Sequence, residues 1–146
     1  LLIGVFFILY LRSIKRAMLV LIPNLIPVFA VSTLMVWLDI SLGVTTAMIA
    51  PIVLGISMDD TLHILYNFRS VRKLNKDVSQ ALDYSIKITS PSLIISSISL
   101  AIGFLIISFS NIPVVADFGL LCVVAVLSAL FADLLIIPAL IRRFWL

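Results

Sequence analysis

The chain has 146 residues, of which 63% are hydrophobic and 12% are charged, and its mean hydropathy is +1.31. Soluble domains carry about 25% charged residues, so this composition excludes a soluble globular protein and predicts a membrane protein. The length allows no more than about five spans of roughly 20 residues, which leaves little for extramembrane catalysis. The net charge of +3 comes from a few basic residues between apolar runs, so no nucleic-acid partner is expected.

The apolar runs divide the chain into five membrane segments. The first, about 1–11, is half as long as a bilayer crossing requires, and no basic residue precedes it. We therefore expect a truncated helix and not a signal peptide, and the chain is expected to be a fragment of a longer protein. The other spans are expected at about 17–38, 44–66, 92–109 and 114–141.

A polar segment separates the third and fourth spans. Apolar residues recur at helical spacing from Val78 to Ile86, which predicts an amphipathic helix at about 75–89 on the membrane surface. Pro91 is expected in the first turn of the next helix, where proline is tolerated. The predicted fold class is all-α: a single domain over 1–146, a polytopic transmembrane bundle of about five helices with one cytoplasmic amphipathic helix.

The ten Lys and Arg residues predict the orientation of the bundle. They lie at 12–16, 69–87 and 142–143, and five spans place all three stretches on one side. The other side carries only Asp39 and Asp117. The positive-inside rule then predicts a multi-pass protein of the cell (cytoplasmic) membrane, with its basic loops and C-terminus in the cytoplasm and its start outside.

Two adjacent acids lie within the third span. All seven acidic residues are aspartates, and Asp59 and Asp60 fall inside an apolar run. An aspartate at the bilayer centre costs roughly 2.5–3.5 kcal/mol on insertion scales, so an acid at that depth is a functional hypothesis by default. His63 is close enough along the helix to reach either carboxylate. Gly55, one turn before Asp59, leaves room for a neighbouring helix.

Other polar residues share roughly the depth of this pair. Counted from the nearest cytoplasmic cation, Asn24 and Asp133 lie eight and nine residues into their spans, which matches the nine residues that separate Asp60 from Arg69. We expect Asn24, the acid pair, His63, Ser96, Ser97 and Asp133 to form a buried polar layer if their faces converge. A position of Asp133 at the cytoplasmic boundary remains an equal alternative.

Small residues on the fourth span are expected to pack near the acids. A stripe of them suits close approach to the third span, although ordinary helix packing without any role in transport explains such a stripe better. The expected packing residues beside the relay are Gly55, Ser96, Ser97, Ser99 and Gly103.

Two buried neighbouring carboxyl groups favour proton exchange, because desolvation and a like charge both disfavour the ionised form. They should titrate as a unit, with His63 as the nearby group able to accept a proton or stabilise the anion. Neutralising the pair removes the cost of repacking its helix and so couples proton flow to a conformational change. We therefore predict a proton relay on Asp59 and Asp60 that His63 tunes.

Three stretches resemble a known superfamily. They are the Ile-Pro-Asn-Leu-Ile-Pro run at 22–27, the segment from Gly55 to Arg69, and the run at 118–140. Their order resembles the second to sixth transmembrane helices of one half of a resistance-nodulation-division (RND) superfamily permease, closest to its MMPL-like hydrophobe exporter branch. Patched and sterol-sensing-domain proteins share this helical plan, and the resemblance covers nearly the whole chain.

The resemblance implies roles for the acids. The Gly-x-x-x-Asp element of that family carries the proton-relay acid, which falls here on Asp59, with Asp60 in the neighbouring position. It also implies a second half and large extracytoplasmic domains, with this segment in the C-terminal half. Multidrug members use an intramembrane lysine as counter-ion, and this segment has none, so a partner charge must come from the remaining half or from His63.

The leading functional hypothesis is proton-motive-force-driven export of a hydrophobic or amphiphilic, lipid-like substrate. The expected partners are that substrate, the remaining half of the same transporter, the lipid bilayer and, as an alternative, further copies of the chain. A non-transporting lipid- or sterol-sensing module and a protein-translocation accessory subunit remain alternatives.

An enzyme is not expected. Asp59 and Asp60 point about 100° apart on one helix, whereas an intramembrane aspartyl protease needs two acids that face each other. One histidine and the lone Cys122 fall short of a metal-ligand set, so neither a metal nor a cofactor is expected.

Overall fold

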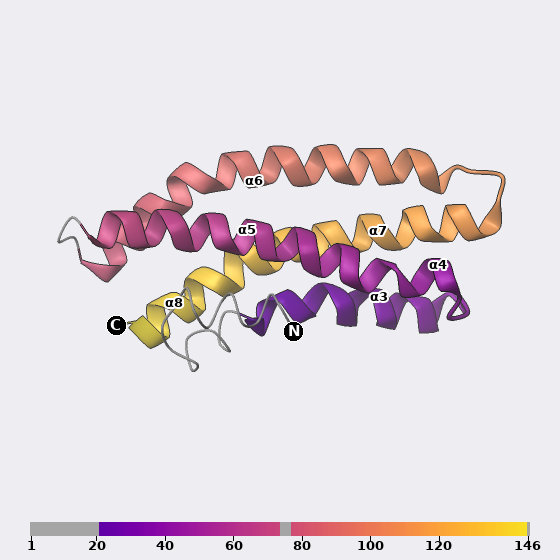
Figure 1. Ribbon diagram of the computed structural model, residues 1–146, viewed down its shortest axis with the longest axis horizontal. Helices are drawn as coiled ribbons and strands as arrows, with labels where there is room; N and C mark the ends of the chain where they lie inside the picture. Colours follow the sequence, from indigo (N-terminus) through magenta and orange to yellow (C-terminus); the bar gives the residue numbers. More distant parts are fainter. Residues whose placement is uncertain (1–20, 74–76, 146) are drawn as a thin grey trace.

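The computed structural model describes residues 21–73 and 77–145, and these residues form a bundle of helices joined by short turns (Figure 1). The expected first span and the basic stretch at 12–16 lie outside the described residues. Within the described part, three helical segments are long and apolar enough to cross a membrane, and Pro23–Trp37 is a shorter apolar helix. The three are Val44–Arg72, Val78–Ser108 and Pro113–Arg143. The all-α polytopic bundle predicted from the sequence is therefore confirmed.

Prolines set where the first two helices begin. The 3₁₀ turn η1 (Pro23–Leu25) starts at Pro23, and α3 (Ile26–Trp37) has Pro27 in its first turn, where a missing N–H group costs no hydrogen bond. After α3 the chain reverses through a turn in which Asp39 adopts a left-handed φ of 55°. The short helix α4 (Val44–Ala47) and the long helix α5 (Ile49–Arg72) then run back along the bundle (Figure 1).

The expected surface helix and fourth span form one continuous helix. This helix, α6 (Val78–Ser108), contains Pro91 in its interior, so the predicted break at Ser90 is absent. Its first third packs on α5: the buried Ser85 donates a hydrogen bond of 2.8 Å to the Ile64 carbonyl, and Asn67 donates one of 2.9 Å to Thr89. These contacts hold the polar third against α5, and Figure 1 shows α6 bending toward it there.

The last expected span is interrupted near its middle. It consists of α7 (Pro113–Phe131), a π-helical turn η2 (Ala132–Ile136) and α8 (Ile137–Trp145). Pro138 is the second residue after the π-helical turn. Because proline has no N–H group, the regular α-helical ladder cannot continue through it, and the wider turn accommodates the change.

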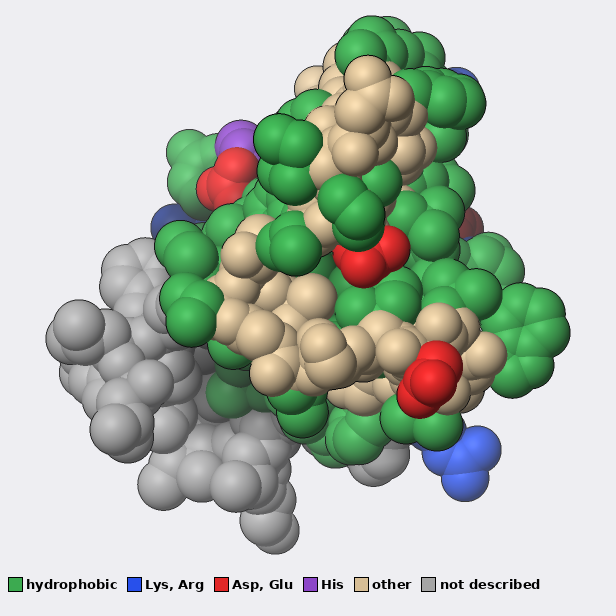
Figure 2. Space-filling view, turned by 90° about the vertical axis from the view of Figure 1, so that its right-hand side faces the viewer, with side chains coloured by type: hydrophobic (Ala, Val, Ile, Leu, Met, Phe, Trp, Pro, Cys, Tyr) green, Lys and Arg blue, Asp and Glu red, His purple; other side chains and the backbone are tan. Residues whose placement is uncertain are grey.

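Figure 1 shows that the end of α5, the start of α6 and the end of α8 lie together at one end of the bundle. The described basic residues lie on these segments, and Arg142 of α8 forms an ion pair with Asp83 of α6. Figure 2 looks onto the opposite end, where acidic side chains face the viewer among hydrophobic ones and blue side chains lie only at the margins. The charge asymmetry inferred from the sequence thus runs along the length of the folded bundle.

Candidate functional site

Two apolar cores divide the bundle along its length. Near the basic end, α5, α6 and α8 pack through residues that include Leu65, Leu82 and Ile141. Near the acidic end, α3, α5 and α7 pack through residues that include Val31, Ile49 and Leu121. Along α5, a buried polar cluster lies between the residues of the two cores. It consists of Asn24, Ser57, Thr61 and Asp133, all with 0% exposed surface.

Hydrogen bonds join these four side chains across three elements. The Ser57 hydroxyl of α5 lies 2.5 Å from Asn24 Oδ1 of η1, and the Thr61 hydroxyl lies 3.1 Å from the same oxygen. Thr61 also lies 2.8 Å from Oδ1 of Asp133 in η2. The second carboxyl oxygen of Asp133, Oδ2, is buried and has no hydrogen-bond partner among the described residues. Thr61 therefore bridges η1 and η2.

The π-helical turn carries Asp133. The N–H group of Ile137 donates to the carbonyl of Ala132, five residues back, which is the wide hydrogen bond of a π-helix. Asp133 and Ala132 are buried within this turn, while Leu135 in the same turn is exposed. The non-α geometry thus lies at the residue that supplies the buried acid.

The acid pair on α5 divides between two environments. Asp60 is 9% exposed and lies within electrostatic range of Asp133, whereas the side chain of Asp59 is 75% exposed. His63 Nε2 lies 4.0 Å from Asp59 Oδ2, and its side chain is also largely exposed. Figure 2 shows this histidine at the surface beside an acidic side chain. The predicted layer therefore consists of an inner part with Asp60, Asn24 and Asp133, and an outer pair.

Among residues 21–73 and 77–145, neither Asp60 nor Asp133 forms an ion pair with a lysine or arginine. The described cations lie near the basic end of the bundle, one or more helical turns away along the chain. In the same part of the chain, no group of three or more His, Cys, Asp or Glu side chains could hold a metal ion.

Only one of the expected packing residues is buried in the described bundle. Ser97 is 2% exposed, whereas Ser96 and Ser99 bond to carbonyls of their own helix. A Cβ atom added at Gly55 or Gly103 would meet no described atom within 4 Å. These small residues line outward surfaces of α5 and α6. The glycine with a close neighbour is Gly119 of α7, where an added Cβ would lie 2.6 Å from the Ser108 amide nitrogen of α6.

Ser57 and Thr61 were not among the residues predicted from the sequence. They lie four residues apart, so they share one face of α5, and the face is polar at the depth already assigned to Asn24 and Asp133. That coincidence of spacing and depth is the signal that could have identified them.

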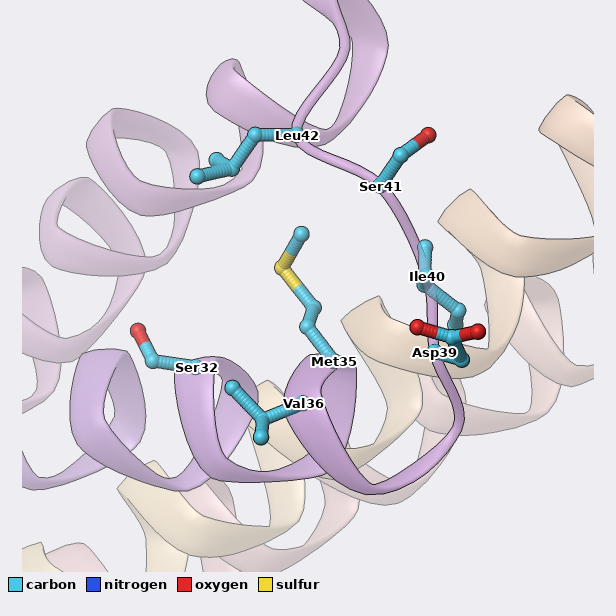
Figure 3. Close-up of a pocket in the computed structure, with 7 residues that line it drawn as sticks. All are labelled: Ser32, Met35, Val36, Asp39, Ile40, Ser41 and Leu42. Atoms are coloured by element: carbon cyan, nitrogen blue, oxygen red, sulfur yellow. The ribbon is translucent and has the colours of Figure 1, made fainter.

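A separate hollow lies near the acidic end of the bundle. It has a volume of about 400 Å³ and lies between α3 and the turn that follows it (Figure 3). Met35 points into its centre, and Asp39 lies at its rim. A neighbouring hollow of about 220 Å³ shares Ser32, Met35 and Leu42 with it and extends toward α5. Both have more apolar than polar lining, which suits an acyl chain or another hydrophobic group.

Comparison with known proteins identifies the family. Residues 16–142 match the family described as the sterol-sensing domain of SREBP cleavage-activation. A protein of Methanocaldococcus jannaschii, MJ1562, whose name describes it only as a membrane protein, is 28% identical over 142 residues. The match covers 96% of this chain and 37% of that relative, so the chain spans about a third of the relative's length. No solved structure matches. Because the family match covers most of its length, the chain belongs to the sterol-sensing domain family.

Proposed function

We propose that this bundle is the proton-coupled part of a membrane transporter that exports hydrophobic or amphiphilic, lipid-like molecules. The observation that carries the proposal is the burial of Asp60 in a membrane-length helix, with no described lysine or arginine paired to it. An uncompensated charge at such a site is costly, so the carboxyl group gains from exchanging a proton. In this proposal Asp59 and Asp60 relay the proton, and His63 tunes Asp59.

The arrangement of the pair supports a relay between two environments. Asp60 faces the inner polar cluster, while Asp59 and His63 face outward from the described bundle. Asp59 on a lipid-facing surface would also be costly, so we propose that the remaining half of the transporter or another copy of the chain covers it. Protonation of either acid lowers the cost of moving α5 relative to its neighbours.

The orientation and location are part of the same proposal. We place the basic end, with Arg69, Arg72 and Arg142, in the cytoplasm of a cell with this protein in its cytoplasmic membrane. The hollow beside Met35 then opens near the outer leaflet.

The test is transport by the complete natural protein in proteoliposomes under an imposed pH gradient. The probe is phosphatidylethanolamine labelled with nitrobenzoxadiazole. In the double variant Asp59→Asn/Asp60→Asn, gradient-driven movement of the probe should fall to the level of protein-free liposomes. The matched control is Asp39→Asn/Asp117→Asn, which removes two acids at the acidic end and should transport as the wild type does. Undiminished, gradient-dependent transport by the first variant would rule out the relay.

The family match favours a second candidate, a lipid-sensing module that does not transport. In that case the hollow beside Met35 binds a lipid and the buried acids only pack the bundle. Replacing Met35 by Trp would then abolish photocrosslinking of a diazirine-labelled sterol probe, while Asp59→Asn/Asp60→Asn would leave the crosslinking unchanged at every pH. Wild-type crosslinking that varies with pH, and that loses this dependence in the acid variant, would favour the transporter over the sensor.

A further inference from the structure

Asp133 is a buried acid that the proposed relay does not use. It is fully buried, its Oδ2 atom has no hydrogen-bond partner within residues 21–73 and 77–145, and its Oδ1 atom lies 2.8 Å from the Thr61 hydroxyl. The number of hydroxyl hydrogens in this cluster limits which hydrogen bonds can form in each protonation state of Asp133.

The Thr61 hydroxyl has one proton and two acceptors within hydrogen-bond distance. The acceptors are Asp133 Oδ1 at 2.8 Å and Asn24 Oδ1 at 3.1 Å, so Thr61 can donate to only one of them at a time. Asn24 Oδ1 also accepts from Ser57 at 2.5 Å. The proton of Thr61 must therefore point either toward η2 or toward η1.

The charge of Asp133 decides between these two arrangements. When Asp133 is ionised it can only accept, so Thr61 donates to it and withdraws its hydrogen bond from Asn24 Oδ1, while the bond from Ser57 to that oxygen remains. When Asp133 carries a proton on Oδ1, that proton is donated to Thr61, and the Thr61 hydroxyl is free to donate to Asn24. In the neutral arrangement Thr61 forms hydrogen bonds to both Asp133 and Asn24, and Oδ2, which has no partner among the described residues, carries no charge.

We propose that Asp133 is a further proton-binding carboxyl group of the bundle, and that the Thr61 hydroxyl transmits its protonation state to Asn24 by turning between the two acceptors. An O–H bond forms or breaks only at Asp133, and the proton is exchanged with water. The Thr61 hydroxyl rotates without losing its own proton. The inference rests on the proposed function only for its use in transport, because the hydrogen-bond chain itself is a property of the described side chains.

The two ends of this chain of hydrogen bonds lie in deformable elements. Asp133 belongs to the π-helical turn before α8, and Asn24 belongs to the 3₁₀ turn before α3. Such turns are less regular than α-helices and are common at functional hinges. Deprotonation would withdraw a hydrogen bond from η1 and place a charge in η2, so both turns would respond to one proton.

Among the charged and titratable groups on the elements around Asp133, Asp60 lies within electrostatic range of it. On α5 the titratable group within range is Asp60, whereas Asp59 and His63 are exposed on the outer surface. On α7, Asp117 and Cys122 lie eleven or more residues before Asp133, and η1 has no titratable residue. On α8, Arg142 and Arg143 are exposed, and Arg142 pairs with Asp83.

The experiment is infrared difference spectroscopy of the complete protein in lipid nanodiscs during a pH titration. The carbonyl stretch of a protonated carboxylic acid separates from other bands, and Asp133→Asn should remove one such component while Asp60→Asn leaves that component in place. The amide band of the same spectra verifies that each variant retains its helices. Spectra of Asp133→Asn with all acid components unchanged would overturn the proposal.

Variants of Thr61 test the transmission. In Thr61→Val the ionised form of Asp133 loses the donor that the described residues supply, so the pH at which its acid band is half lost should rise by about one unit, because hydrogen bonds to charged groups are the stronger ones. Thr61→Ser should restore the wild-type value, and Ser57→Ala, which contacts Asn24 but not Asp133, should leave it nearly unchanged. A titration of Thr61→Val equal to that of the wild type would overturn the role of Thr61.

These results are independent of the transport assay. Loss of transport in Asp59→Asn/Asp60→Asn with an unchanged spectrum of Asp133→Asn would retain the proposed function and reject this inference. The opposite pair of results would reject the proposed function and retain a proton-linked contact between η1 and η2.

Discussion

Adjacent aspartates on α5 lie in opposite environments because successive residues of a helix point about 100° apart. Asp60 faces the interior and Asp59 faces outward with His63. The resemblance to RND permeases implied the first acid of the pair as the relay residue, whereas burial singles out the second. The sequence could give their depth, because distances to the nearest cations are fixed by the helical rise. It could not give their direction, because α5 carries polar residues on several sides at this depth.

Gly119 is the residue at which the bundle tolerates no side chain. A Cβ atom there would lie 2.6 Å from the Ser108 nitrogen and 2.8 Å from the Phe104 carbonyl oxygen, both backbone atoms of α6. Gly119→Ala should therefore lower the free energy of unfolding by about 1–3 kcal/mol, since α6 must move away. The measurement is thermal unfolding of the purified complete protein in detergent, followed by circular dichroism.

Gly103→Ala is the matched control for that substitution. Its Cβ atom would meet no described atom within 4 Å, and alanine is favoured over glycine in helices by up to about 1 kcal/mol. It should leave the protein as stable as the wild type or slightly more stable. Equal destabilisation by both substitutions would contradict the close contact between α6 and α7.

At the level of elements, the helix boundaries depended on tertiary contacts that local sequence does not reveal. Ser90-Pro91 has the pattern of a helix start, and proline is equally compatible with the interior of a membrane helix whose neighbours stabilise it. Because Ser85 and Leu82 pack against α5, the segment before Pro91 stays in line with the rest of the helix, and α6 is continuous. The π-helical turn was likewise not predicted from the sequence.

A core substitution tests whether the first third of α6 belongs to the bundle. Leu82 is 0% exposed, so Leu82→Ala should cost about 2–5 kcal/mol of stability. The control is Ile88→Ala on the same segment, which is 50% exposed and should cost far less. Both changes can be measured by chemical unfolding in mixed micelles. If the segment were a separate helix on the membrane surface, the two variants would be similarly stable.

At the level of the whole molecule, charged residues are separated along the long axis of the bundle, and the buried polar residues lie near its middle. Cations gather at one end, Asp39 and Asp117 lie toward the other, and apolar cores flank the buried cluster. The fold class and this distribution follow from composition and span lengths. The hydrogen bonds through Ser57 and Thr61 do not, because hydroxyl residues are common in membrane helices and reveal a site only when a second helix supplies their acceptor.

The central claim is that Asp59 and Asp60 carry protons during transport. Its most direct measurement is proton entry into proteoliposomes that contain the complete protein and a pH-sensitive dye, started by adding labelled phosphatidylethanolamine. Replacing both Asp59 and Asp60 by asparagine should slow the probe-dependent proton entry about a hundredfold, as expected when a proton-transfer group is lost. Asp39→Asn should leave the rate unchanged. Equal rates of proton entry in the wild type and the double variant would contradict the account.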